Sequence, residues 1–321
     1  MKSNLHIIVS CTDRKRAAVS DELHLRSIPV KPVEDRAKAW WLRLARHQGQ
    51  AIPAIDLYAG GHWSIVRALP ESARQTNLNA KLWVISAGYG LVSSSACLHP
   101  YSATFAGTHP DTVTTSEING SSRKELLQKW WDTLSKFPGP SLGEPRSVAE
   151  LAQKSRNAYF LIIASPDYLS ALEQDLSSAT EYIRDRNNLI IVTAPSAKVS
   201  ESLNANLIPS SARLQSRVGG TRGSLHARVA LMILKNVESW GFGAEVLRDR
   251  INSLVAQSPE LLKYERKRIT DKEVSDFIRA SLKQSPQASC TSLLRSLRDR
   301  ELACEQSRFK DLYWGIKEAG R

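Results

Sequence analysis

Four short apolar runs, each followed by a polar or glycine-rich turn, constrain the fold of this chain more than any other feature. They span Leu5–Ser10, Leu82–Ser86, Tyr159–Ala164 and Leu189–Thr193. Runs of this length that are bounded by turn residues are typical of buried strands. Segments of helical periodicity lie between them. Strands that alternate with helices predict an α/β fold, with a mainly parallel sheet and helices on both faces.

The segments between these runs divide into helices and two long loops. Residues 102–122 lack periodicity and are rich in Ser and Thr, and residues 194–223 are polar, so both are predicted to be surface loops. Loops of this length in compact domains are often functional. The predicted helices cover residues 32–48, 124–137, 147–156, 166–182 and 224–237.

The last part of the chain is helical and charged, which predicts a second domain. We place the boundary after residue 240, giving an α/β domain of residues 1–240 and an all-α unit of residues 241–321. Three helices are predicted in this unit, with Thr270 and Ser289 as N-caps of the first two. They cover Asp271–Lys283, Thr291–Arg300 and Glu305–Lys317.

The order of these three helices is that of a helix-turn-helix reader, whose second helix contacts base edges near its N-terminus. A helical appendage or a dimerisation unit would show the same pattern, and the sequence leaves that choice open. If the unit reads DNA, its contacts lie near the start of the last helix and face outward: Gln306, Ser307, Arg308 and Lys310.

Charge indicates a polyanionic partner. The 321 residues include 44 Lys and Arg against 32 Asp and Glu, a formal net charge of +12. This surplus suits double-stranded DNA, although it is spread along the chain and a merely basic protein would share it. No protein partner is evident from the sequence. No membrane association is expected either, since no apolar run approaches the roughly 20 residues of a membrane-spanning helix.

The cysteines and the N-terminus bear on the compartment. The four cysteines lie far apart and form no C-x-x-C pair, which argues against a zinc site or a disulfide framework. The first residues have only a short apolar run, unlike a signal peptide. We therefore expect a cytoplasmic protein with no metal and no cofactor.

Two of the turns place an aspartate close to a tyrosine. Asp56 and Tyr58 are two residues apart in "AIDLYAGGHW", and in an extended segment both would share one face. Asp167 and Tyr168 lie at a helix start in "IIASPDYL", where backbone N–H groups favour anions. Each aspartate has a structural interpretation as well, the first as a turn residue and the second as a favourable helix-terminal charge.

Other turns carry further candidates. In "GGTRGSLHAR", Arg222 could clamp a phosphate, and His226 is either functional or a core histidine. Trp63 follows two glycines and could stack on a base. In "VISAGYGLVSSSACLHPY", Tyr89 and Tyr101 could form two walls of a nucleotide site. No Walker A, dinucleotide-binding, zinc-protease or nucleophile-elbow motif is present, which argues against those classes of enzyme.

Several segments together resemble, in the same order, the bacterial YaaA peroxide-stress family and its relatives. They are "VSCT" with a nearby lysine, "DLYAGG", "LWVISAGYGLVSSSACLHPY", "AYFLIIASPDYL" and "RGSLHAR", within residues 1–236. The resemblance implies a Rossmann-like α/β domain that binds DNA. The helical tail is a departure from that family. A YaaA-like core, a DNA-reading tail and a basic chain together resemble a phage-defence DNA glycosylase, a class that excises glucosylated hydroxymethylcytosine.

This resemblance implies a hydrolase that cleaves an N-glycosidic bond in phage DNA and leaves an abasic site, as an antiviral defence. Such cleavage builds positive charge on the deoxyribose, which a carboxylate can stabilise. The target base must also leave the duplex. The sequence singles out no lysine as a Schiff-base former, so a monofunctional glycosylase is expected. The alternatives are a non-catalytic DNA-binding stress or regulatory protein and a base-exchange transferase.

The predicted site residues fall into three groups. The catalytic carboxylates are Asp56 first and Asp167 second. The substrate-binding residues are Cys11, Thr12, Tyr58, Trp63, Ser86, Tyr89, Tyr101, Ser165, Tyr168 and His226. The DNA-binding residues of the first domain are Lys15, Arg213, Arg217, Arg222 and Arg228.

Overall fold

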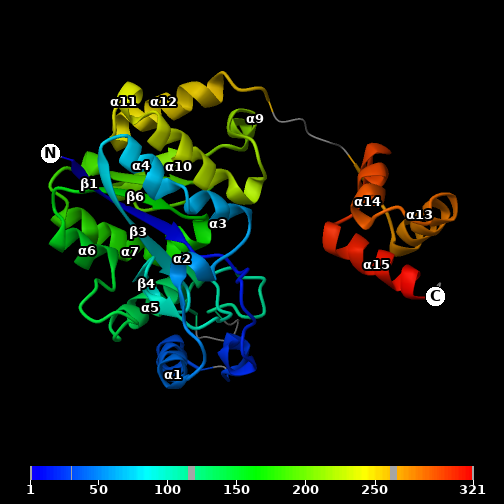
Figure 1. Cartoon of the computed structure of the whole chain (residues 1–321), viewed down its shortest axis with the longest axis horizontal. Coiled ribbons are helices and arrows are strands. Elements are labelled where there is room, and N and C mark those ends of the chain that lie inside the picture. Colours follow the sequence, from blue (N-terminus) through cyan, green and yellow to red (C-terminus); the bar gives the residue numbers. More distant parts are fainter. Residues whose placement is uncertain (1, 30, 115–119, 261–265, 320–321) are drawn as a thin grey trace. The chain divides into compact units, whose positions relative to one another are not determined.

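The computed structural model describes residues 2–29, 31–114, 120–260 and 266–319. The chain forms two compact units, Met1–Pro259 and Glu260–Arg321 (Figure 1). Helix α12 (Ala244–Ala256) packs on strands of the first unit, because Leu247 and Ile251 are fully buried in its core. The boundary between the units along the chain therefore falls after α12, whereas the boundary predicted from the sequence, after residue 240, falls before it.

The first unit is built on a six-stranded sheet with the order β4-β3-β1-β6-β7-β8. All neighbouring strands are parallel except β3 and β4, which form an antiparallel hairpin. Counted along the chain, this is the 3-2-1-4-5-6 order of doubly wound nucleotide-binding sheets. The strands are β1 (Ser3–Ser10), β3 (Leu78–Ser86), β4 (Gly90–Ser93), β6 (Tyr159–Ile163), β7 (Leu189–Thr193) and β8 (Leu207–Pro209).

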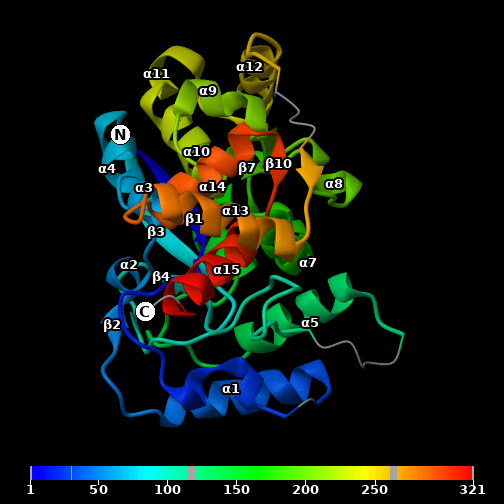
Figure 2. The ribbon, with the colours of Figure 1, turned by 90° about the vertical axis from the view of Figure 1, so that its right-hand side faces the viewer.

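Helices cover both faces of this sheet. Figures 1 and 2 both show α4 and α10 on one side and α5 and α7 on the other. The longer helices are α1 (Val33–Arg46), α5 (Arg123–Ser135), α6 (Val148–Lys154), α7 (Pro166–Tyr182) and α10 (Leu225–Lys235). Shorter ones are α2 (Ala54–Leu57), α3 (Gly61–Val66), α4 (Leu69–Gln75), α8 (Glu201–Asn204), α9 (Gln215–Val218) and α11 (Val237–Trp240). A separate small sheet pairs β2 (Ile52–Pro53) with β5 (Cys97–Leu98).

The predicted strands and long helices are confirmed, and the α/β class with them. The range Pro166–Tyr182 of α7 is the predicted one, because proline at the first helical position sets its start. Short elements were missed. Strand β8 lies inside the predicted loop of residues 194–223, and α2 and α3 replace the extended segment expected around Asp56. The predicted loop of residues 102–122 contains turns and bridges, and residues 115–119 lie outside the described part.

A buried histidine on β1 makes the stability of this unit depend on pH. Trp83 donates its indole N–H to Nδ1 of His6 at 3.1 Å, and burial lowers the pKa of His6 from 6.5 to about 4. The unfolded chain therefore binds the proton first as pH falls. Stability conferred by the neutral imidazole is complete above 6.5 and decreases by about 3 kcal/mol as pH approaches 4.

We expect the free energy of unfolding to fall between pH 6.5 and 4, measured by urea denaturation at a series of pH values. His6→Gln keeps an acceptor for the Trp83 indole and cannot titrate in this range, so its profile should be flatter. Equal slopes for the variant and the parent protein would show that His6 does not carry this dependence.

The second unit has its own hydrophobic core. Helices α13 (Asp271–Gln284), α14 (Cys290–Asp299) and α15 (Gln306–Ala319) follow the predicted ranges closely. Thr270 forms a capping box with Glu273, and Ser289 caps α14, so both predicted caps are confirmed. Two short parallel strands, β9 (Lys267–Arg268) and β10 (Leu302–Ala303), join the helices. The unit is therefore not purely helical.

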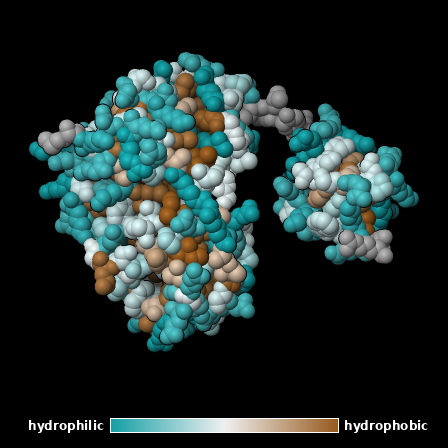
Figure 3. All heavy atoms as spheres, viewed as in Figure 1, coloured by the Kyte–Doolittle hydropathy of each residue, from teal (hydrophilic) through white to brown (hydrophobic). Residues whose placement is uncertain are grey.

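In Figure 3, polar and charged residues cover most of the visible face of the second unit, with a few hydrophobic residues among them, and larger brown patches lie on the face of the first. Among the residues that the structure describes, three large hydrophobic side chains are exposed: Leu142, Val246 and Trp314. Within the described ranges, no helix is both long enough and apolar enough to cross a membrane.

Candidate functional site

The carboxyl ends of β1 and β6 are the point where the strand order reverses, and doubly wound sheets bind ligands outside this point. The loop after β1 is held there by the segment around Tyr58. Arg16 N donates to Leu57 O at 2.9 Å, and Ala59 N donates to Arg14 O at 2.9 Å. These bonds bring Tyr58 to the end of β1.

Five buried polar side chains meet at this edge. The Tyr101 hydroxyl lies 2.7 Å from Ser86 Oγ, 3.0 Å from the Tyr58 hydroxyl and 3.6 Å from Cys11 Sγ. Cys11 Sγ in turn lies 3.2 Å from the Tyr168 hydroxyl. We call these five residues the tyrosine cluster. The sequence named all five as substrate-binding residues, and the structure brings them together from β3, α7, the residue directly after β1 and two loops.

Burial sets the protonation of the cluster. It raises the pKa of Tyr58, Tyr101 and Tyr168 well above 10, so the phenols are neutral hydrogen-bond donors at physiological pH. Lys15 is half-buried beside them, with Nζ 4.5 Å from the centre of the Tyr101 ring. Burial lowers the pKa of Lys15, and the negative charges of Asp13 and Asp111 oppose that shift.

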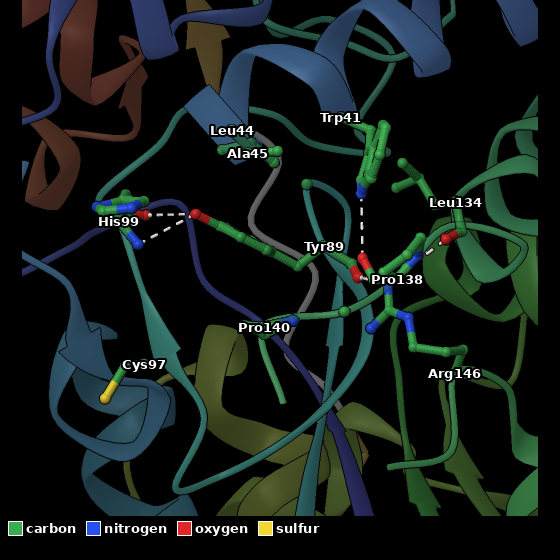
Figure 4. Close-up of a pocket in the computed structure, with 12 residues that line it drawn as sticks. Trp41, Leu44, Ala45, Tyr89, Cys97, His99, Leu134, Pro138, Pro140 and Arg146 are labelled. Atoms are coloured by element: carbon green, nitrogen blue, oxygen red, sulfur yellow. Dashed lines mark hydrogen bonds between the residues drawn. The ribbon is translucent and has the colours of Figure 1, made fainter. Parts of the chain in front are cut away.

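A cavity of about 330 Å³ lies next to the cluster, among α1, α5 and the β3–β4 hairpin (Figure 4). Tyr89 lines it and also packs edge-on against Tyr101, with ring centres 5.2 Å apart. The Tyr89 hydroxyl accepts from His99 N at 3.0 Å. Trp41 and Arg146 form other walls, and Arg146 donates to Leu91 O at 2.7 Å. The volume is within the range of small-ligand sites.

Gly88 separates this cavity from the cluster. An added Cβ at Gly88 would lie 2.5 Å from a carbon of the Tyr101 ring, so the ring occupies the space that a side chain would need. The absence of a side chain at Gly88 therefore lets the Tyr101 ring of the same chain lie against this backbone.

A second polar group lies at the same sheet edge, around His226 of α10. The His226 ring makes a short hydrogen bond through Nδ1 to Ser210 Oγ. His62 of α3 lies beside His226 and the Ser10 carbonyl, and burial lowers the pKa of His62 to about 4. Within the described ranges, His62 Nε2 and Thr193 Oγ1 are buried without a hydrogen-bond partner.

The two predicted catalytic carboxylates lie outside the tyrosine cluster. Asp56 is exposed on the single turn α2, whereas Tyr58 is buried, because a helical turn separates side chains that a strand would have aligned. Asp167 forms an ion pair with Arg123 at 2.7 Å, and both side chains are 42 % exposed. Neither aspartate has a hydrogen bond to a cluster residue in the described part of the chain.

Two predicted substrate-binding residues, Trp63 and Thr12, have structural roles, and a third, Ser165, makes no capping bond. Trp63 is fully buried against Tyr58 and donates to Ile55 O at 2.9 Å, so it offers no face for stacking on a base. Thr12 donates to Ala59 O at 3.0 Å and fixes the loop after β1. Ser165 is the N-cap residue of α7, and its side chain makes no capping hydrogen bond.

Most of the arginines predicted to bind DNA are bonded to their own chain. Arg213 donates to Ser258 O at 3.1 Å, Arg217 donates to Ser258 Oγ at 3.0 Å, and Arg228 donates to Ser224 Oγ at 3.1 Å. Arg222 is exposed. These contacts hold the loop before α10 and the end of α12 in place.

The second unit has a groove of about 470 Å³ between α14 and α15. Gln306 and Lys310 line it, as does the exposed Trp314. Arg308 is directed elsewhere, since its guanidinium donates to Asp271 Oδ1 at 2.6 Å and to Ile269 O at 3.0 Å. Ser307 Oγ donates to Glu305 at 2.7 Å. The groove is also lined by Arg266, Cys290, Thr291, Leu294, Arg295, Arg298 and Asp299.

Sequence reasoning missed His62 and the buried carboxylate of Asp111. Asp111 accepts from Arg26 N at 2.8 Å and Ser102 Oγ at 2.7 Å, and these bonds outweigh burial and lower its pKa. The histidine next to two glycines in "AGGHW" was a usable signal for His62. Asp111 lies in a segment without periodicity, where no local pattern marks it. The described residues contain no group of three or more His, Cys, Asp or Glu able to hold a metal ion.

No protein-family model, no curated protein and no solved structure matches the chain.

Proposed function

We propose that this protein is a DNA glycosylase that excises glucosylated hydroxymethylcytosine from phage DNA and leaves an abasic site, as a cytoplasmic antiviral defence. The observation that carries the proposal is the tyrosine cluster. It gathers three neutral phenols, a thiol and a serine at the sheet edge where nucleotides bind, beside a cavity of small-ligand size. The net charge of +12 suits a DNA substrate.

The chemistry of base excision fits this set of groups. Cleavage of the bond between C1′ and the base leaves negative charge on the base and positive charge on the deoxyribose. Neutral phenols such as Tyr101 and Tyr168 can donate hydrogen bonds to the departing base. Asp13 and Asp111 are the carboxylates whose charges act on Lys15, which lies against the Tyr101 ring, so they are further candidates for stabilising the positive charge on the deoxyribose.

The second unit would hold the DNA. Arg295 and Lys310 line the groove between α14 and α15 and can pair with phosphates, while Trp314 offers a partly exposed ring for stacking on an unpaired base. This use of the start of α15 is compatible with a helix-turn-helix reader, whose contacts lie near the N-terminus of its second helix.

Base release from defined DNA tests the proposal. The full chain is incubated with matched duplexes that contain either cytosine or one glucosylated hydroxymethylcytosine, and released base and alkali-labile sites are measured. We expect release from the modified duplex. DNA binding without release from either duplex would replace the proposal by a non-catalytic DNA-binding protein. Incorporation of a labelled free base would indicate a base-exchange transferase.

The same assay tests the position of Asp56. Because its side chain is exposed and has no hydrogen bond to the cluster in the described part of the chain, Asp56→Asn should retain base release within about twofold of the parent rate, as exposed substitutions usually have small effects. A loss of a hundredfold or more would return Asp56 to the catalytic group. The exposed Glu201→Gln of α8 is the matched control for removing one surface carboxylate.

A further inference from the structure

The hydrogen bonds of Ser210 determine which nitrogen of His226 carries the proton. Ser210 Oγ lies 2.8 Å from Thr193 O and donates to it, because a carbonyl oxygen can only accept. A hydroxyl has a single proton, so Ser210 must accept its second bond, the one to His226 Nδ1. The neutral imidazole therefore carries its proton on Nδ1, and the lone pair is on Nε2.

The surroundings keep this imidazole neutral and leave its Nε2 available. Burial lowers the pKa of His226, and the neighbouring His62 has a pKa of about 4 and is neutral as well. In the part of the chain that the structure describes, no hydrogen bond reaches His226 Nε2. Enzymes orient a histidine base in this way: a hydrogen-bonded partner fixes one ring nitrogen, and the other nitrogen is left to accept a proton.

His226 and the tyrosine cluster lie at the same edge of the sheet. Helices α3 and α10 are neighbours on one face, and α7, which carries Tyr168, packs on the other (Figures 1 and 2). The His62 ring lies beside the Ser10 carbonyl, and the next residue is Cys11 of the cluster. Donors and a base thus flank the end of β1, as acid and base flank the scissile bond in glycoside hydrolysis.

We propose that His226 is the general base that activates water for base excision, an inference that rests on the proposed function. The oxygen of water forms a bond to C1′ as the bond from C1′ to the base breaks, and that electron pair leaves with the base. One proton of the water passes to Nε2 of His226. The departing base takes up a proton from solvent, and His226 releases the proton on Nε2 to solvent. One water is therefore consumed overall. Ser210 is a positioning residue that sets the tautomer.

The test measures single-turnover base release by the full chain on the glucosylated hydroxymethylcytosine duplex. His226→Asn can still donate to Ser210 but lacks the base, so its rate should fall by about 10²–10⁴-fold while DNA affinity stays within about threefold. Added imidazole should raise the rate of His226→Ala at least tenfold over its rate without imidazole. Ser210→Ala should lose about tenfold, because the ring keeps its base but loses its fixed tautomer.

The matched control is His47→Asn, which replaces a histidine at the end of α1 and should retain the parent rate. A His226→Asn rate within threefold of the parent would overturn the inference and leave the glycosylase in place. A slow variant that added imidazole does not rescue also counts against a base, and thermal unfolding separates that result from misfolding. No release by the parent protein would overturn the proposed function instead.

Discussion

Phe309→Ala should unfold the second unit and leave the first unit folded. Phe309 is fully buried in the core of a unit of about 60 residues, among Val274, Ile278, Leu297 and Tyr313. Truncating a buried phenylalanine costs about 3–5 kcal/mol, and a domain of this size has roughly 3–9 kcal/mol in total. The expected loss is therefore comparable to the total stability of this unit.

Limited trypsin digestion followed by mass spectrometry measures this effect. Rapid cleavage is expected within residues 266–319 of the variant, with protection of residues 31–114 and 120–259 as in the parent protein. DNA affinity should fall as well if the groove between α14 and α15 binds DNA. Glu318→Ala, an exposed position on the same helix, is the control and should keep the parental digestion pattern. Protection of the second unit in Phe309→Ala would contradict the expected loss of stability, and cleavage of the first unit as well would contradict the independence of the two cores.

Gly88→Ala should disturb the tyrosine cluster directly. The new Cβ would lie 2.5 and 2.6 Å from two carbons of the Tyr101 ring. That ring cannot turn aside freely, since its hydroxyl is bonded to Ser86 and Tyr58. Overpacking of this kind typically costs about 1–3 kcal/mol. The Tyr101 hydroxyl should therefore move out of hydrogen-bond range of part of the cluster.

Thermal unfolding measures the loss of stability in Gly88→Ala, and base release measures the effect of the displaced Tyr101 hydroxyl. We expect a lower Tm for the first unit and at least a tenfold lower rate of base release, since a displacement of about 1 Å costs about a hundredfold in well-ordered sites. Gly61→Ala is the matched control, because its Cβ would meet nothing within 4 Å. A Gly88→Ala protein with parental rate would show that the position of Tyr101 is not important for the reaction.

Local patterns were sufficient for much of the fold. Apolar runs such as Leu189–Thr193 form strands because their length and flanking turns allow little else, and Pro166 marks the start of α7 for steric reasons. The caps Thr270 and Ser289 were visible for the same reason, since a cap acts on the next three residues only. The short strand β8 was missed because three residues carry too little periodicity.

Local sequence patterns predicted only part of the candidate site. The residues of the tyrosine cluster were recognisable as polar groups that follow strands, so Cys11, Ser86 and Tyr168 could be named. Asp56 was misplaced because one turn of helix replaces an extended segment there, which turns its side chain outward while Tyr58 points inward. The difference between strand and helix over four residues is decided by packing rather than by propensity.

The sequence by itself determined the strands, the long helices, their caps and the basic character of the chain, because each depends on neighbouring residues or on composition. Only the tertiary structure decided which side chains meet. The strand order places Cys11 beside Tyr168, which is 157 residues away, and the parallel pairing of β7 with β8 puts Ser210 against the Thr193 carbonyl. The proton position on His226 follows from that pairing, and no local pattern contains it.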